Sequence, residues 1–171
     1  VQPVYATADQ AGYRYARRFM AQFVGLPEQR LTDELVDAAQ GDIFIGLDLQ
    51  PVVIPTQREY LLEWRRRGIH VSFVVYDLLP VTLPEYFPPE GQHLHSQWLN
   101  VVAEFDSVVC ISKAVAEEFR QWLDIQSTVK RLRPLSIEHF HLGADLSASA
   151  PTAGIADDAS QLLTAMQGSP S

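Results

Sequence analysis

The alternation of apolar and polar stretches along the chain predicts a regular succession of strands and helices. Continuous apolar runs rich in β-branched and aromatic residues occupy residues 42–48, 71–77 and 107–111. Runs of this kind are typical of central strands buried on both faces of a parallel sheet. Amphipathic stretches with helical spacing lie between them, at 55–67 and 91–105. The pattern predicts an α/β fold: a Rossmann-like parallel sheet of at least four strands, with helices on both faces.

The flanks of this region carry weaker signals. Residues 1–6 suit a short strand, and Thr7 with Gln10 has the spacing of a capping box that begins a helix. The helix would place one apolar stripe inward, formed by Gly12, Ala16, Phe19, Met20 and Phe23. Residues 84–89 are expected to be a non-helical loop because of their prolines, and residues 130–140 read as a last strand.

Composition narrows the function classes. The chain has 171 residues, 47% of them hydrophobic, which is enough for one domain with a sizeable core. Its formal net charge of -8 without a long basic block argues against nucleic-acid binding. Its single cysteine, Cys110, lies in an apolar run and cannot form an internal disulfide. Two His-x-His pairs lack an evident third ligand, so we predict no metal site.

The two ends of the sequence suggest a piece of a longer protein. The chain starts at Val1, without methionine, inside a strand-like run. Residues 146–154 have the composition of a linker, and residues 155–166 have the spacing of one more amphipathic helix. We therefore expect residues 1–145 to form a Rossmann-like domain, and residues 146–171 to be a linker and terminal helix that lead to a further domain.

Candidate chemistry gathers where the predicted strands end. Asp48 and Asp77 each close an apolar run, and Ser112 with Lys113 follows another where a helix begins. In open α/β sheets, ligands bind at this carboxyl edge, and a carboxylate there can orient a hydroxyl or accept its proton. A helix start beside a lysine suits an anion. Each residue also has a purely structural interpretation: a turn former for Asp77 and a helix cap for Ser112.

Three segments resemble landmarks of the amino-terminal domain of family 4 glycosyltransferases. They are Val75-Tyr76-Asp77-Leu78-Leu79-Pro80-Val81, Cys110-Ile111-Ser112-Lys113-Ala114-Val115-Ala116 and Phe140-His141-Leu142-Gly143-Ala144-Asp145. Their order and spacing are similar to those of bacterial mannosyl- and rhamnosyltransferases that build surface polysaccharides such as the lipopolysaccharide O-antigen. One departure concerns the residue before the aspartate, which is Tyr76 here and histidine in many relatives, so no role of that histidine is carried over.

The resemblance implies half of a GT-B enzyme, the acceptor-side domain of a retaining glycosyltransferase. The nucleotide-sugar would bind mainly to another domain, so this chain alone is expected to be inactive and to need no metal or cofactor. The resemblance makes Asp77 the catalytic residue. It implies substrate contacts at Asp48, Tyr76, Leu78, Leu79, Ser112, Lys113, Gly143 and Asp145.

The implied partners are a glycan or lipid-linked acceptor and, in the complete enzyme, a nucleotide-sugar, with no nucleic acid. The implied location is cytoplasmic, and peripheral association of the complete enzyme with the inner membrane stays open. A second hypothesis belongs to a different class: a non-catalytic α/β binding or regulatory module within a larger protein.

Overall fold

The computed structural model describes residues 1–26, 31–125, 134–141 and 143. The chain divides into two units, Val1–His141 and Leu142–Ser171. All the elements below belong to the first unit. The helix predicted within residues 155–166 and the first part of the predicted last strand, residues 130–133, lie outside the described residues.

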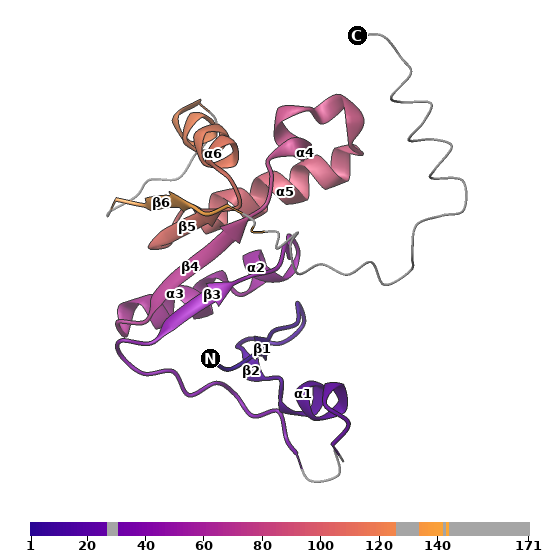
Figure 1. The fold of residues 1–171 in the computed structure, drawn as a ribbon, viewed down its shortest axis with the longest axis vertical. Helices are drawn as coiled ribbons and strands as arrows, with labels where there is room; N and C mark the ends of the chain where they lie inside the picture. Colours follow the sequence, from indigo (N-terminus) through magenta and orange to yellow (C-terminus); the bar gives the residue numbers. More distant parts are fainter. Residues whose placement is uncertain (27–30, 126–133, 142, 144–171) are drawn as a thin grey trace, which may run out of the picture. The chain divides into compact units, whose positions relative to one another are not determined.

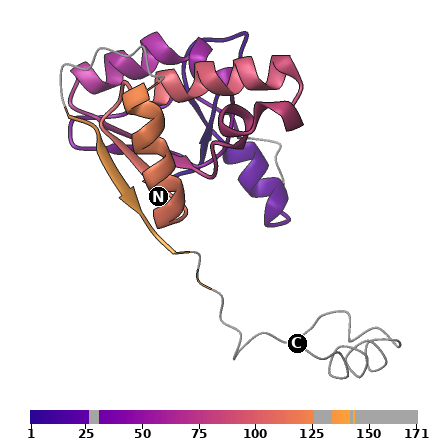
Figure 2. The same cartoon turned by 90° about the horizontal axis from the view of Figure 1, so that it is seen from above.

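Four parallel strands form the main sheet in the order β3-β4-β5-β6 (Figure 1). They are β3 (Ile43–Gly46), β4 (His70–Val75), β5 (Ser107–Cys110) and β6 (Ser136–His139). Helices connect successive strands: α2 (Val53–Thr56) with α3 (Arg58–Arg66), then α5 (Pro89–Val102), then α6 (Lys113–Ile125). These helices pack around the sheet (Figure 2), so the predicted α/β class is confirmed.

The core forms where β4 meets the inward faces of the helices. Phe73 in β4 is fully buried, and its ring lies 5.5 Å from that of Phe105. Each helix adds a large apolar side chain at the position that its spacing predicts, because i, i+3 and i+4 residues share one face. The buried side chains from the helices include Leu61, Trp64, Trp98, Leu99, Phe119 and Trp122.

The prediction of a central, doubly buried strand at 42–48 is wrong for β3. Within the described residues, β3 is an edge strand that pairs only with β4. Phe44 is buried, but Ile43 and Ile45 on the opposite face are 66% and 51% exposed. A continuous apolar run therefore identified a strand correctly, but it did not reveal whether both faces are covered.

The helix predicted to begin at Thr7 starts ten residues later, because Gly12 has a φ of +96° that a helix cannot contain. Two short strands, β1 (Val4–Tyr5) and β2 (Arg14–Tyr15), pair antiparallel instead and do not join the parallel sheet. The helix that does form is α1 (Arg17–Phe23). Phe19, Met20 and Phe23 of the predicted inward stripe are 63%, 37% and 77% exposed. Gly12 and Ala16, which precede the helix, are buried as predicted.

The proline-rich loop is more helical than predicted. After β4 the chain forms α4 (Leu79–Thr82) and a short 3-10 turn, η1 (Pro84–Tyr86). Pro89 then begins α5, two residues before the predicted start. Proline suits the first helical position because its missing N–H would have no partner there, so Pro89 starts the helix instead of preventing it.

Candidate functional site

Three candidate residues follow neighbouring parallel strands at the same distance from the strand end. Asp48 lies two residues after β3, Asp77 two residues after β4, and Ser112 two residues after β5. Because these strands are parallel and adjacent, their ends meet at one edge of the sheet. The structure therefore places the three side chains at the carboxyl edge, while their roles in binding stay predictions.

Asp77 stabilises the turn after β4 and also lies at the carboxyl edge of the sheet. Its Oδ1 accepts a hydrogen bond from the Leu79 N–H at 3.1 Å, which is the geometry of an Asx turn leading into α4. The side chain is only partly buried. One carboxylate oxygen thus fixes the turn and orients the group, and an asparagine could make the same bond. The structural and the catalytic interpretations of Asp77 are therefore compatible.

The residues on either side of Asp77 differ in what they can contact. Tyr76 is 42% exposed, and its hydroxyl donates a 2.7 Å hydrogen bond to the Leu47 carbonyl, so it joins the ends of β4 and β3. Leu78 is fully buried in the core, whereas Leu79 is 42% exposed. A ligand at this edge would therefore meet the side chains of Tyr76 and Leu79, while Leu78 serves packing.

His95 in α5 is a titratable neighbour of Asp77 that the sequence analysis did not select. Its side chain is 3% exposed, and its Nε2 has no hydrogen-bond partner among the described residues. Burial lowers the pKa of His95, against the opposing attraction of Asp77 and a hydrogen bond with the Asp77 backbone. Burial therefore favours the neutral form of this imidazole, which contacts the Asp77 backbone.

A signal for His95 was present in the helix spacing. His95 lies four residues before Leu99, on the stripe that the helix buries. The His-x-His spacing of His93 and His95 suggests metal ligands first, and the helix phase that buries His95 is easily missed beside it. Among the described residues, no group of three or more His, Cys, Asp or Glu side chains could hold a metal ion.

The remaining edge residues have defined local roles. The Ser112 Oγ accepts a hydrogen bond from the Val115 N–H at 3.2 Å, so Ser112 caps α6 as its structural interpretation predicted. Lys113, the first residue of α6, is exposed. Asp48 is also exposed, and its carboxylate accepts a 3.5 Å hydrogen bond from the Gln50 amide. Anion binding at Ser112 and Lys113 stays a prediction.

The last landmark spans the boundary between the two units, and its site residues Gly143 and Asp145 belong to the second unit. Gly143 is exposed, with no atom close to where a Cβ would stand, and Asp145 lies outside the described residues. Their predicted contacts with substrate therefore stay predictions. Cys110, by contrast, is fully buried, and burial raises the pKa of its thiol to about 11, as expected for an inert core cysteine.

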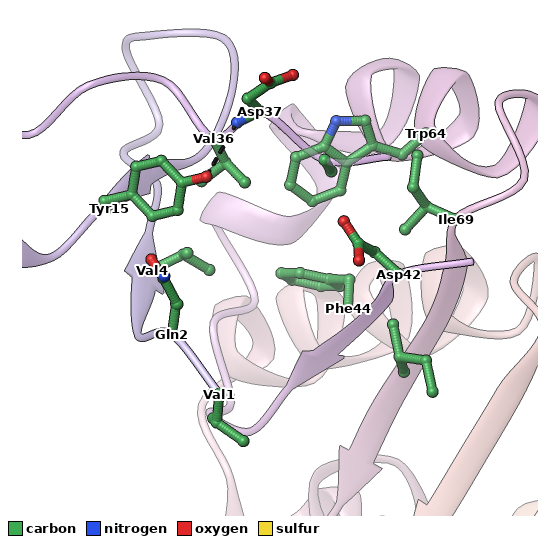
Figure 3. A pocket seen from close by; sticks show the side chains of 12 residues that line it. Val1, Gln2, Val4, Tyr15, Val36, Asp37, Asp42, Phe44, Trp64 and Ile69 are labelled. Carbon is green, nitrogen blue, oxygen red and sulfur yellow. Dashed lines mark hydrogen bonds between the residues drawn. The ribbon is translucent and has the colours of Figure 1, made fainter. Parts of the chain in front are cut away.

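A cavity lies at the amino end of β3, away from Asp48, Asp77 and Ser112. It has a volume of about 340 Å³ and is lined by Asp42, Phe44 and Trp64 together with side chains from the first residues of the chain (Figure 3). Asp42 precedes β3, so this cavity is at the amino edge of the sheet. Two aspartates, Asp37 and Asp42, line it, and the Asp42 carboxylate accepts a hydrogen bond from the Ala39 N–H at 2.8 Å. Volume alone therefore does not mark the candidate site.

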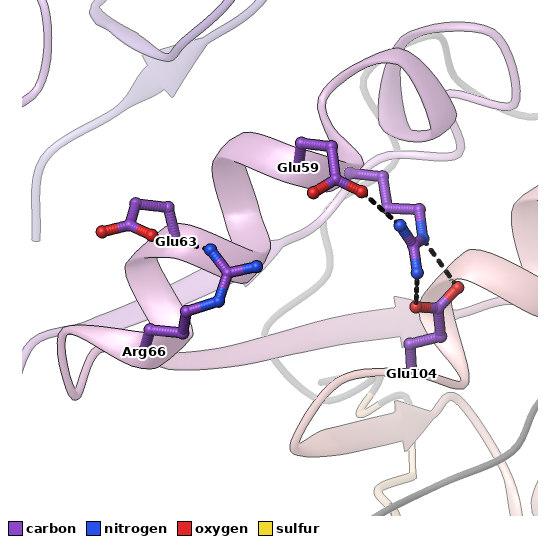
Figure 4. A network of polar contacts seen from close by, with 5 residues as sticks. Glu59, Glu63, Arg66 and Glu104 are labelled. Carbon is purple, nitrogen blue, oxygen red and sulfur yellow. Dashed lines mark hydrogen bonds and ion pairs between the residues drawn. The ribbon is translucent and has the colours of Figure 1, made fainter.

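Ion pairs at the amino edge fix α3 to the turn before β5. Arg58 binds Glu104 through two nitrogens and also contacts Glu59 (Figure 4). Arg65 pairs with Asp106 at 2.9 Å, and the other oxygen of Asp106 accepts the Val71 N–H at 3.0 Å. These ion pairs hold α3 and the turn before β5 together at the amino edge of the sheet.

Comparison with known proteins identifies relatives of this chain. Three curated relatives, each a serotype-specific mannosyltransferase WbdA of Escherichia coli, are 35% identical to the chain over 173 aligned positions. The alignments cover 100% of this chain but only 20–21% of each relative, so the chain spans about a fifth of their length. No family model matches the chain, and no solved structure matches it.

No helix in the described part of the chain is both long and apolar enough to cross a membrane.

Proposed function

We propose that this chain is the acceptor-side domain of a retaining glycosyltransferase with a GT-B fold, belonging to family 4. The observation that carries the proposal is the 35% identity that extends over the whole chain to proteins named as mannosyltransferases. The parallel sheet supports it, because Asp77, the aspartate of the first landmark, lies at the carboxyl edge where α/β proteins bind ligands. The acceptor would be a growing surface polysaccharide of the O-antigen type.

In this proposal Asp77 acts on the acceptor hydroxyl. One of its carboxylate oxygens is fixed by the Leu79 N–H, and the other can accept a hydrogen bond or the proton of that hydroxyl. The hydroxyl oxygen then bonds to the anomeric carbon of the donor sugar, and the bond from that carbon to the nucleoside diphosphate breaks. The buried imidazole of His95, which is hydrogen-bonded to the Asp77 backbone, would help to hold this turn in place.

The other edge residues would position the substrates. Asp48, Tyr76 and Leu79 present polar and apolar groups to the acceptor, and Lys113 at the start of α6 attracts its anionic parts or the donor phosphates. We also assign substrate contacts to Gly143 and Asp145, as the resemblance implies. A further domain, outside this chain, would hold most of the nucleotide-sugar, so no metal or other cofactor is required of this domain.

The proposal also implies a cellular location for the complete enzyme. A nucleotide-sugar and a lipid-linked glycan acceptor meet at the cytoplasmic face of the inner membrane, so the enzyme would work in the cytoplasm, with peripheral contact to that membrane. The second candidate, a non-catalytic α/β module, gains support only if the carboxyl edge proves dispensable for sugar transfer.

The test compares the complete enzyme with the isolated chain. Purified complete enzyme, given a GDP- or dTDP-sugar and a glycan acceptor, should transfer sugar with retention of the anomeric configuration. The 171-residue chain should transfer none and should bind the nucleotide-sugar more weakly than micromolar, a value that corresponds to about 8 kcal/mol. Absence of transfer by the complete enzyme with every sugar donor tried would contradict the proposal.

A further inference from the structure

Among the described residues, β3 is a free edge of the main sheet, yet its sequence does not protect that edge. The strand and the residue after it read Ile43-Phe-Ile-Gly-Leu47, without a charge or a proline. Edge strands usually carry charged residues or proline, because their unpaired N–H and C=O groups otherwise attract another strand. β6, at the other edge, follows this rule, since its sequence is Ser-Ile-Glu-His. β3 therefore has the composition of a strand with neighbours on both sides.

The peptide groups of β3 show which hydrogen bonds are open. The His70 N–H donates to the Asp42 carbonyl, so the Asp42 carbonyl faces β4. Because successive residues of a strand direct their peptide groups to opposite sides, Phe44 also faces β4, whereas Ile43 and Ile45 face away from it. No described strand pairs with β3 on that side, and the side chains of Ile43 and Ile45 are 66% and 51% exposed. β3 thus offers outward peptide groups and apolar side chains to one further strand.

A slot lies between this open side of β3 and the hairpin of β1 and β2. Two cavities, of about 340 and 100 Å³, are both lined by Val4 of β1 and Phe44 of β3, so they adjoin each other. The first reaches Asp42 at the amino end of β3 (Figure 3), and the second reaches Asp48 beyond its carboxyl end. Among the described residues, β1 pairs only with β2. The slot therefore follows β3 over its whole length, with an unpaired strand edge on each side.

The position of the slot limits what can fill it. A strand that enters between two others must be free on both of its edges. Each described strand already pairs with a neighbour, so a second copy of the folded chain has no such strand to insert. The stretches of the sequence outside the described residues contain no apolar run like that of β3. The alignments, however, cover only 20–21% of each curated relative, which leaves most of the relatives' length outside this chain.

We propose that a β-strand from the part of the full-length polypeptide outside these 171 residues lies in this slot. It hydrogen-bonds to the outward peptide groups of Ile43 and Ile45 on one side and to β1 on the other, and so joins the hairpin to the main sheet. Its apolar side chains cover those of Ile43 and Ile45. The strand itself does not depend on the proposed function. Its consequence for the site does: a strand parallel to β3 would end beside Asp48 and bring a residue of its own to the carboxyl edge.

Hydrogen exchange of the complete protein, resolved to single amides by mass spectrometry, tests for this strand. The outward amides of an edge strand are open to water, whereas every amide of a central strand is hydrogen-bonded. The amides of Ile43 and Ile45 should therefore exchange within about tenfold of those of Phe44 and Gly46, which face β4. Exchange of Ile43 and Ile45 at the rate of an unfolded peptide, beside protected Phe44 and Gly46, would overturn the proposal and make β3 a true edge.

A variant of the complete protein places a charge beside the slot. Ile45→Asp should speed exchange of the Ile43 amide at least about tenfold relative to Phe44, because a carboxylate buried without a partner weakens the added strand. The matched control is Ile125→Asp, the same change at an isoleucine of α6 that is 80% exposed and lines neither cavity, and it should leave the Ile43 rate unchanged. An unaltered Ile43 rate in Ile45→Asp would contradict the proposal.

The oligomeric state decides between the proposed strand and a second copy. Protection of the Ile43 amide should be the same at every protein concentration, because the strand belongs to the same polypeptide. Protection that appears only as the protein concentration rises would assign the slot to another molecule and overturn the proposal. None of these exchange rates depends on sugar transfer, so failure of the added strand and failure of the proposed function are separate results.

Discussion

Replacing Trp98 by alanine tests the core that positions the carboxyl edge. Trp98 lies in α5, is 1% exposed, and packs its ring 5.4 Å from that of His95, the neighbour of Asp77. Truncation of a buried tryptophan removes its transfer free energy and leaves a cavity, which together cost about 3–5 kcal/mol. Because the Trp98 indole N–H has no partner among the described residues, no hydrogen bond is lost. We therefore expect a loss near the lower end, about 3 kcal/mol.

Denaturant unfolding followed by far-ultraviolet circular dichroism measures this loss, because the signal does not depend on the removed indole. Tyr86→Ala, at a side chain that is 76% exposed, serves as the matched control and should change the free energy of unfolding by less than about 0.5 kcal/mol. A loss below about 1 kcal/mol for Trp98→Ala would show that α5 does not bury this face, and would refute the packing described for the candidate site.

Three other changes probe different parts of the fold. Asp106→Ala removes both the ion pair with Arg65 and the acceptor of the Val71 N–H, so unfolding measurements should show a loss of about 1–3 kcal/mol, and an unchanged free energy would contradict the pairing. Gly68→Ala forces a side chain into a φ of +86° and should cost about 1–2 kcal/mol by the same method, unless the turn relaxes to a negative φ. Burial lowers the pKa of His95, so below its ordinary value of 6.5 the unfolded chain takes up a proton that the folded chain does not. Stability should therefore fall between pH 7 and pH 5 more steeply than in His95→Gln, and equal slopes would show that His95 is not buried in its neutral form.

The strand and helix pattern was largely predictable from the sequence because it depends on local periodicity. The apolar run at 71–77 became β4, and the spacing of Leu61, Trp64 and Trp98 correctly gave the buried helix faces. Periodicity failed where long-range contacts decide the outcome. Nothing local distinguishes β3, at the edge of the described sheet, from a central strand.

Backbone conformation explains the other errors. The apparent capping box at Thr7 fits a helix locally, but Gly12 adopts a positive φ, and a Cβ there would also crowd the side chains of Leu35 and Tyr60. For the candidate site, the parallel topology was sufficient to bring Asp48, Asp77 and Ser112 to one edge. The helix spacing indicated that His95 is buried, but its contact with the Asp77 backbone depends on how α5 packs against the end of β4, which the sequence does not show.

The most direct test of the central claim is the effect of Asp77→Asn on turnover and stability, measured on one preparation of the complete enzyme. Asparagine can still accept the Leu79 N–H, so the melting temperature should stay close to that of the unmodified enzyme. Turnover should fall about tenfold or more, which corresponds to at least about 1.4 kcal/mol of lost transition-state stabilisation. Asp48→Asn should cause a smaller loss. Unchanged turnover together with a lowered melting temperature would make Asp77 a turn-forming residue only and would contradict the assignment of the active site to this edge of the sheet.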